Sequence, residues 1–243
     1  MTDARAKPVI DLHQVKHRCA TCSLAELCLP LGLTREDVGK LERLIEPRGP
    51  LHADDHLFRV GDPFRAIFAV RSGYFKTYLV DDAGREQVLG FHLPGELMGL
   101  DAIYPEHHQC NAVALDTAAV CELPFRSVET LAGTIPSLQR SMFRLMSKEL
   151  GESHALAGDL SAEERLAQFL LSLANRLKAR GYSDTRLTLA MPRRDIANFL
   201  ALATETVSRV FTRFEKDGLI HVDRREVTLL DLDRLNALCR HSG

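Results

Sequence analysis

Three of the six cysteines in this chain lie within ten residues of one another, at Cys19, Cys22 and Cys28. Thiolates are soft ligands that bind zinc, copper(I) and iron–sulfur clusters, and a Cys-x2-Cys pair keeps two sulfurs within reach of one centre. The five residues before Cys28 let a third sulfur swing towards the same centre. The spacing therefore predicts a metal site whose fourth ligand comes from elsewhere in the chain.

Two simpler explanations compete with a metal site. The cysteines could be a chance group of reduced thiols, or part of a disulfide framework. Residues 1–5 lack the basic segment followed by an apolar run that marks a secreted protein, which makes disulfides the weaker explanation. His17 is a conceivable further ligand, although a plain surface histidine explains it more simply.

Composition describes an ordinary soluble protein with room for two small domains. The 243 residues are 45% hydrophobic and 26% charged, with a formal net charge of −2. No apolar run is long enough to span a membrane. Residues 193–225, however, hold seven basic and five acidic side chains, a local excess of +2. This excess favours a phosphate-binding surface on one part of the chain.

Residues 51–125 have the pattern of a β-sandwich or jelly roll. Short β-forming runs at 66–70, 74–80 and 87–91 are each followed by a turn signal. After Pro136 the pattern changes to a helical stripe, which consists of Leu138, Met142, Leu145 and Met146. This stripe either covers the β domain or pairs with its counterpart in a second copy.

The C-terminal third predicts a helix-turn-helix. A helix over residues 162–180 precedes a short helix over 193–200, a turn at 201–203 and a second helix over 204–216 that Asp217-Gly218 terminates. Apolar residues lie on one face of the second helix (Val207, Val210, Phe211 and Phe214), and polar residues lie on the other (Glu205, Ser208, Arg209 and Thr212). Residues 221–230 read as a hairpin with a charged tip, the wing of a winged helix.

The polar face of the second helix carries groups that read base pairs. In a major groove Arg209 can donate two hydrogen bonds to guanine, Glu205 can accept one from cytosine, and Ser208 can reach a base edge or a phosphate. The alternative is that Glu205 only complements the positive end of the helix and Arg209 is a solvated charge.

The segment Glu205-Thr206-Val207-Ser208-Arg209 matches the E-x-x-S-R signature of the CRP/FNR family of bacterial transcription regulators. The resemblance runs almost end to end: residues 91–99 resemble the family's cyclic-nucleotide-binding jelly roll, and residues 144–147 resemble the start of its dimerisation helix. It implies an α+β chain of four parts. These are a cysteine-rich cluster-binding arm (1–30), a cyclic-nucleotide-binding-like β-roll (31–133), a dimerisation helix (134–160) and a winged helix-turn-helix DNA-binding domain (161–243).

The cysteine arm resembles that of the oxygen-sensing FNR branch. Members of this branch hold a [4Fe-4S] cluster through three N-terminal cysteines and one from the β domain, and oxygen degrades the cluster, which lowers dimer formation and DNA affinity. By this resemblance Cys121 is the fourth ligand. Cys110 is its rival on composition alone, and Cys239 is a plain thiol.

The resemblance also implies roles for other residues. The DNA-binding residues would be Glu205, Thr206, Ser208, Arg209 and Arg194, and the palindrome would resemble TTGAT-N4-ATCAA. The dimerisation residues would be Met142, Leu145, Met146 and Leu150, and the RNA polymerase contact would be Asp81, Asp82, Gly84 and Arg85. No cyclic nucleotide is expected, because residues 107–111 lack the arginine that pairs with the cyclic phosphate in the catabolite-activator branch.

Three features depart from the family pattern. Ala201 stands where the turn commonly has glycine, which costs little if the residue keeps a right-handed conformation. The link between the dimerisation helix and residue 162 is about three residues shorter than in well-known members. The dimerisation helix also weakens after Leu150, which predicts a marginal dimer.

These observations predict a cytoplasmic, homodimeric, oxygen-responsive transcription regulator, mainly an activator of anaerobic or microaerobic genes, that is not an enzyme. The first alternative is a zinc-stapled regulator with a small-molecule effector in the β-roll. The second is an iron–sulfur enzyme or electron carrier, for which the sequence offers neither a second cofactor motif nor a set of acid, base and nucleophile.

Overall fold

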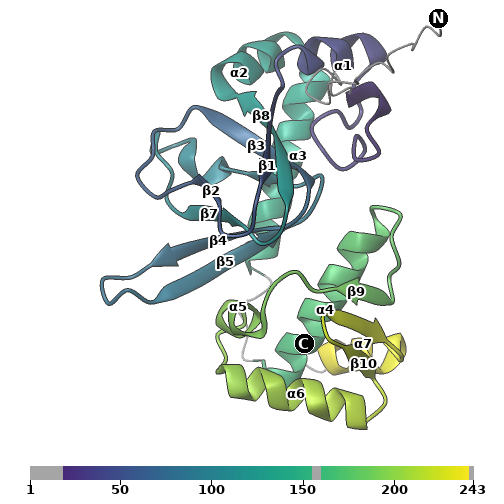
Figure 1. Cartoon of the computed structure of the whole chain (residues 1–243). Coiled ribbons are helices and arrows are strands. Elements are labelled where there is room, and N and C mark those ends of the chain that lie inside the picture. Colours follow the sequence, from purple (N-terminus) through teal and green to yellow (C-terminus); the bar gives the residue numbers. More distant parts are fainter. Residues whose placement is uncertain (1–18, 155–159, 241–243) are drawn as a thin grey trace, which may run out of the picture.

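The computed structural model describes residues 19–154 and 160–240. Figure 1 shows a β-roll with helices at one end, and a smaller helical unit with its own small sheet beyond the β4–β5 hairpin. Within the described ranges, no helix is both long enough and apolar enough to cross a membrane.

The β-roll consists of two four-stranded antiparallel sheets, with strand orders β1-β8-β3-β6 and β2-β7-β4-β5. The strands are β1 (Glu46–Leu51), β2 (His56–Phe58), β3 (Ala66–Ser72), β4 (Phe75–Val80), β5 (Glu86–His92), β6 (Leu97–Met98), β7 (Asn111–Ala114) and β8 (Ala118–Pro124). A short helical turn, η3 (Leu100–Ala102), follows β6. The predicted jelly roll is confirmed, and its three predicted strands correspond to β3, β4 and β5.

Strand β3 is buried on both faces, because one face meets the interior of the roll and the other meets a layer of helices. Phe68 and Val70 pack into the interior with Phe58 and Phe75. Their neighbour Ile67 faces the opposite way, into the helical layer. Alternate side chains of a strand point to opposite faces, so this one strand joins two cores.

The helical layer contains the cysteine arm. It consists of the turn η2 (Cys19–Thr21), α1 (Arg35–Glu42), α2 (Phe125–Thr134) and α3 (Pro136–His154). Leu29 from the arm, Leu41 from α1 and Leu138 from α3 are all 0% exposed and share one apolar cluster. The arm is therefore built into the core beside α3.

The C-terminal unit is a winged helix. Its elements are α4 (Ala162–Lys178), β9 (Arg186–Thr188), α5 (Arg193–Phe199), α6 (Thr204–Lys216), β10 (Ile220–Asp223), β11 (Glu226–Leu229) and α7 (Leu232–Arg240). Helix α4 begins with a capping box, in which Ser161 and Glu164 each bond to the other's backbone N–H. The core of this unit also takes in Val88, Phe91 and Leu93 from the β-roll.

Several boundaries differ from the sequence-based expectation. Helix α3 continues through Gly151 to His154, and β1 begins five residues before Leu51. The prolines Pro47 and Pro50 obscured β1, and they are tolerated because β1 is an edge strand. The pattern of residues did not reveal α1, α2, β9 or α7.

Candidate functional site

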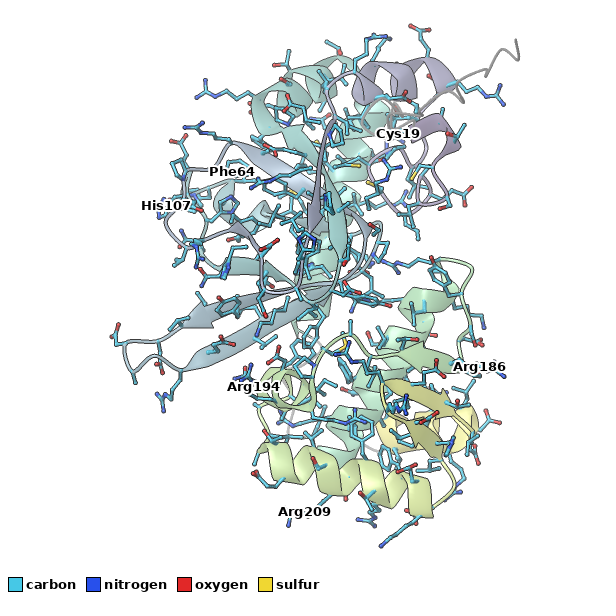
Figure 2. The ribbon with its side chains drawn as sticks, in the orientation of Figure 1. Cys19, Phe64, His107, Arg186, Arg194 and Arg209 are labelled. Atoms are coloured by element: carbon cyan, nitrogen blue, oxygen red, sulfur yellow. The ribbon has the colours of Figure 1, made fainter. Side chains whose placement is uncertain are left out.

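The second helix of the helix-turn-helix, α6, separates its faces as the sequence predicts. Val207, Val210, Phe211 and Phe214 are at most 5% exposed and pack on α4 and α5. Glu205, Ser208, Arg209 and Thr212 are exposed. Figure 2 shows Arg209 on the outer side of the unit, away from the β-roll. Within residues 19–154 and 160–240, the polar face of α6 is therefore exposed to solvent.

Hydrogen bonds within α6 orient its polar groups. The guanidinium of Arg209 donates to the hydroxyl of Thr206 at 3.2 Å. The hydroxyl of Ser208 donates to the carbonyl of Thr204 at 2.9 Å, which commits its proton but leaves its oxygen able to accept a hydrogen bond. Thr206, itself an expected DNA-binding residue, thus also helps to hold the side chain of Arg209 in place.

The turn before α6 contains a strained residue. Ala201 has a φ of 53°, in the left-handed region. The expectation that alanine would cost little here depended on a right-handed conformation, and it is wrong. A residue with a Cβ in this region costs about 1–2 kcal/mol. The bond from the N–H of Leu202 to the carbonyl of Ala197 (2.9 Å) closes the turn.

Two adjacent arginines on α5 have different environments. The guanidinium of Arg193 lies 3.3 Å from the centre of the Phe211 ring, a cation–π contact that joins α5 to α6. Arg194 is exposed, and its Nε is 3.4 Å from Asp195 Oδ1. Sequence reasoning did not identify the role of Arg193, since its partner Phe211 lies on another helix.

The hairpin of β10 and β11 forms the wing, with Val222 opposite Val227. Arg224 and Arg225 lie at its exposed tip, and Arg224 takes a φ of 54° in the turn. A hollow on the same unit is lined by residues of α6, including Arg209, Arg213 and Lys216. Positive charge thus lies on both α6 and the wing, a suitable arrangement for phosphates.

The four cysteines that were expected to bind a cluster lie together. Cys28 and Cys121 contact the same apolar cluster between the arm and β8. The thiols of Cys19, Cys22 and Cys28 are each in electrostatic contact with one another and with Cys121. Cys19 is labelled in Figure 2, where the arm meets the β-roll. Tertiary structure therefore supplies the arm with a fourth sulfur.

Burial makes these sulfurs poor thiolates by themselves. Burial, followed by repulsion from Cys121, raises the pKa of Cys19 to about 12. Burial likewise raises the pKa of Cys28 to about 12. For Cys121 burial also raises the pKa, against an opposing effect of the nearby Arg71 guanidinium. Cys19, Cys28 and Cys121 are partly buried and Cys22 is exposed, and a cationic centre bound between them would favour the thiolate form that their surroundings disfavour.

The arrangement of the sulfurs bears on which centre fits. Among the residues that the structure describes, no group of three or more His, Cys, Asp or Glu side chains could hold a single metal ion. The donor set, four sulfurs near one another, is of the soft kind that binds zinc, copper(I) or an iron–sulfur cluster. His17, the conceivable further ligand, lies outside the described residues.

The other two cysteines are elsewhere. Cys110 is 4% exposed and belongs to the interior of the β-roll, in a different core from Cys28. Its thiol lies 3.6 Å from Asp101 Oδ2, and burial and that carboxylate raise the pKa of Cys110 to about 12. Cys239 is on α7, where its thiol donates to the carbonyl of Leu235.

The hairpin between β4 and β5 carries the residues expected to touch RNA polymerase. Asp81 organises the turn: it accepts from the backbone N–H groups of Ala83 and Arg85, both at 2.9 Å, and pairs with the Arg85 guanidinium at 2.7 Å. Gly84 supplies a φ of 76°. Asp82 is exposed beside them. The turn is thus a fixed, charged projection.

The residues expected to form the dimer interface differ in how far they pack within this chain. Met142 and Leu145 pack partly against the chain's own helical layer, while Met146 is only partly buried. Leu150 lies on α3, but its side chain is not among those that the structure describes. Phe143, which sequence reasoning missed, is 62% exposed and lies three residues before Met146. That spacing was the available signal for a second apolar stripe.

Comparison with known proteins identifies the two units. Residues 49–134 match the model of the cyclic nucleotide-binding domain, and residues 164–238 match that of the Crp-like helix-turn-helix domain. The transcriptional activator protein anr of Pseudomonas aeruginosa is 48% identical over 223 residues, covering 90% of this chain and 91% of that protein. The chain belongs to the CRP/FNR family of transcription regulators.

Other CRP/FNR proteins match over similar lengths. The fumarate and nitrate reduction regulatory protein of Salmonella typhimurium is 40% identical over 92% of this chain and 91% of its own. The structure of FixK2 from Bradyrhizobium japonicum superposes with a TM-score of 0.73, at 28% identity, covering 80% of this chain and 96% of that chain. The predicted family and fold are confirmed.

Proposed function

We propose that this CRP/FNR protein is an oxygen-responsive activator of anaerobic or microaerobic genes that holds a [4Fe-4S] cluster through Cys19, Cys22, Cys28 and Cys121. The observation that carries the proposal is the gathering of these four thiols between the arm and β8. The names of relatives point the same way, among them the anaerobic regulatory protein of Haemophilus influenzae, which is 42% identical over 89% of this chain and 86% of its own.

The cluster would supply a positive, oxygen-labile centre that binds the four thiolates. The chain's own residues do the rest. Leu29 anchors the arm in the core shared with Leu138 of α3. The guanidinium of Arg71 favours ionisation of Cys121. Loss of the centre would remove the bonds that tie the arm to Cys121 and leave separate thiols in their place, so that the packing of the arm against α3 would depend on apolar contacts such as that of Leu29 alone.

A second copy would bind along the outer stripe of α3. Phe143 and Met146 lie at helical spacing on it, and Phe143 is too exposed to serve the monomer's core. Apolar side chains repeated along one stripe are what a two-helix seam requires. Because the inner stripe of the same helix packs on the cysteine arm, the state of the arm bears directly on the seam.

Each protomer would read one half of a palindrome with α6. Arg209 would donate to guanine and Glu205 would accept from cytosine on the opposite strand. The wing tip at Arg225 and the exposed Arg194 would contact phosphates. The charged turn around Asp81 and Arg85 would contact RNA polymerase, which makes the protein an activator.

The alternative with a small-molecule effector has less support. Packed side chains such as Phe68, Phe75 and Met98 fill the interior of the β-roll. At the position where a cyclic phosphate would need an arginine, the carboxylate of Asp101 accepts from the N–H of Gln109 at 2.8 Å. A carboxylate repels a phosphate, so a cyclic nucleotide is not the expected effector.

The test is the iron and acid-labile sulfide content of protein purified without air. We expect about four of each per chain, together with visible absorption that air removes; zinc would give neither. The matched variants are Cys121→Ser, which should lose the cluster, and Cys110→Ser, which should keep it. A coloured Cys121→Ser protein beside a colourless Cys110→Ser protein would overturn the ligand assignment.

A further inference from the structure

Asn198 on α5 pairs with the backbone of β5 in the way that a neighbouring strand would. Its Nδ2 donates to the carbonyl of Glu86 at 2.6 Å, and its Oδ1 accepts from the N–H of Val88 at 2.6 Å. Strand β5 is an edge strand, so the N–H and C=O groups on its outer side have no neighbouring strand to pair with and can bond to a side chain instead. One carboxamide thus attaches the helix-turn-helix to the sheet of the other domain. Figure 1 shows α5 close to the β4–β5 hairpin.

A buried charge cluster lies beside this pairing. The ammonium of Lys76, on β4, is 2.9 Å from Asp195 Oδ2 and 3.0 Å from Glu86 Oε2. Lys76 is 6% exposed and Asp195 is 3% exposed. Buried charges are tolerated only when paired in good geometry, so the lysine fixes where α5 can lie against the hairpin.

Apolar and ionic contacts extend the same interface. The rings of Phe91 (β5), Phe169 (α4) and Phe199 (α5) pack together, with centroid separations of 6.0, 5.3 and 5.9 Å. Further along, Glu96 pairs with Arg176 and Arg180 of the last turns of the α4 region. Domain interfaces of this extent and apolarity resist the relative motion that is otherwise expected between domains.

This interface leaves the DNA-reading surface open. While α5 is attached to β5, the outward side chains of α6, Glu205 and Arg209 among them, remain exposed. The contact between α5 and β5 therefore does not cover the recognition helix α6. Its effect is instead to fix the orientation of α6. Helix α5 joins α6 through a four-residue connection and the Arg193–Phe211 contact, so the orientation of one helix sets that of the other.

We propose that Asn198 is a positioning residue whose pairing with β5 fixes the angle of the recognition helix to the β-roll, and so sets the half-site spacing that the dimer accepts. The proposal rests on the proposed function. A dimer gains from binding two half-sites at once only when both recognition helices are held at the right separation. Without the pairing, α5 keeps only its ionic and aromatic contacts with the β-roll, and some of the lost order must be regained at the moment of binding.

The experiment compares Asn198→Ala with Asn175→Ala, a change of the same kind at an exposed position of α4. Binding is measured on the palindrome, on palindromes with the spacer one base pair longer or shorter, and on a single half-site, with protein prepared without air. Asn198→Ala should lose about tenfold on the palindrome, but no more than about twofold on the half-site, and should discriminate less between spacers. Asn175→Ala should match the wild type.

A second measurement reads the contact directly. The backbone amide of Val88 should exchange with solvent faster in Asn198→Ala than in the wild type or Asn175→Ala. Asn198→Asp should lose affinity for the palindrome as Asn198→Ala does, because a carboxylate cannot donate to the Glu86 carbonyl, although its oxygens can still accept from the Val88 N–H. Equal losses on half-site and palindrome, or unchanged Val88 exchange, would overturn the proposal. If the wild type bound the palindrome no better than the half-site, the proposed dimeric function would fail, and Val88 exchange would still decide whether Asn198 docks the domain.

Discussion

Ser141 on α3 donates its hydroxyl proton to the backbone carbonyl of Leu31 at 2.6 Å, although the two residues are 110 positions apart. Leu31 in turn donates its N–H to the carbonyl of Cys28 at 3.1 Å. One short path of hydrogen bonds thus runs from an expected cluster ligand to the expected dimerisation helix. Ser141 is 5% exposed, so water is a poor substitute for its hydroxyl.

The first prediction concerns this path. Ser141→Ala leaves a carbonyl of the arm without its partner, which should cost about 1–3 kcal/mol of stability and loosen the arm. The visible absorption of the anaerobic protein should then bleach faster in air. Ser147→Ala, at an exposed position of the same helix, is the control. Equal bleaching rates for the two variants would show that the bond does not protect the cluster site.

The second prediction concerns the dimer seam. Phe143→Glu would place a charge in the proposed apolar stripe and should weaken the dimer by about 2 kcal/mol or more, about thirtyfold in the dissociation constant. Sedimentation of the anaerobic protein measures the effect. Tyr104→Glu changes an aromatic residue that is 97% exposed on the β-roll, and should leave the dimer intact. If both variants stay dimeric, the seam lies away from Phe143.

The third prediction separates base reading from phosphate contact. Arg209→Ala should cost about 1–3 kcal/mol on the matched palindrome and relax the preference at one base position. Arg225→Ala, at the wing tip, should weaken matched and scrambled DNA alike and reduce the salt dependence of binding. Titrations of both duplexes at several salt concentrations provide the measurement. Equal losses on the two duplexes for Arg209→Ala would remove Arg209 from the reading set.

The fourth prediction follows from the strained turn. Ala201→Gly should stabilise the protein by about 1 kcal/mol, because glycine adopts the observed φ of 53° without strain. Ala179 has a φ of −60°, so Ala179→Gly should destabilise it by about 0.5–1 kcal/mol instead. Thermal unfolding of the two variants shows whether each change raises or lowers the stability of the protein. A loss of stability in Ala201→Gly would mean that the turn is not strained.

The fifth prediction concerns mild acid. Burial lowers the pKa of His92 to about 4, and its ring is hydrogen-bonded to the Thr77 hydroxyl at 3.1 Å. Since the unfolded histidine titrates near 6.5, unfolding takes up a proton between pH 6.5 and 4, and stability falls as the pH drops through that window. The loss from His92 alone is on the order of 3 kcal/mol.

His92→Gln keeps a polar partner for Thr77 but cannot take up a proton. Its urea midpoint should therefore fall less than that of the wild type between pH 7 and pH 5, whereas His52→Gln, at an exposed site, should follow the wild type. Part of the acid loss should remain, because burial also lowers the pKa of His108. Identical profiles for all three proteins would exclude His92 as a source of acid sensitivity.

Local sequence signals predicted what depends on neighbouring residues. The period of the apolar positions in residues 204–216 predicted both the helix and its buried face, because a helix brings every third and fourth residue to the same side. The spacing of Cys19, Cys22 and Cys28 predicted a soft metal site, because cysteines so close in sequence can reach one centre. Short elements without a clear period, such as α1 and β9, were not predicted.

The sequence by itself determined the types of the strongly periodic elements, the exposed polar face of α6 and three of the four gathered sulfurs. Only the tertiary structure decided that Cys121 lies beside the arm while Cys110 lies in the other core. It also decided the left-handed turn at Ala201 and the pairing of Asn198 with β5. A periodic pattern shows which face of an element is apolar, but not which distant surface it will meet, because that depends on the packing of the whole chain.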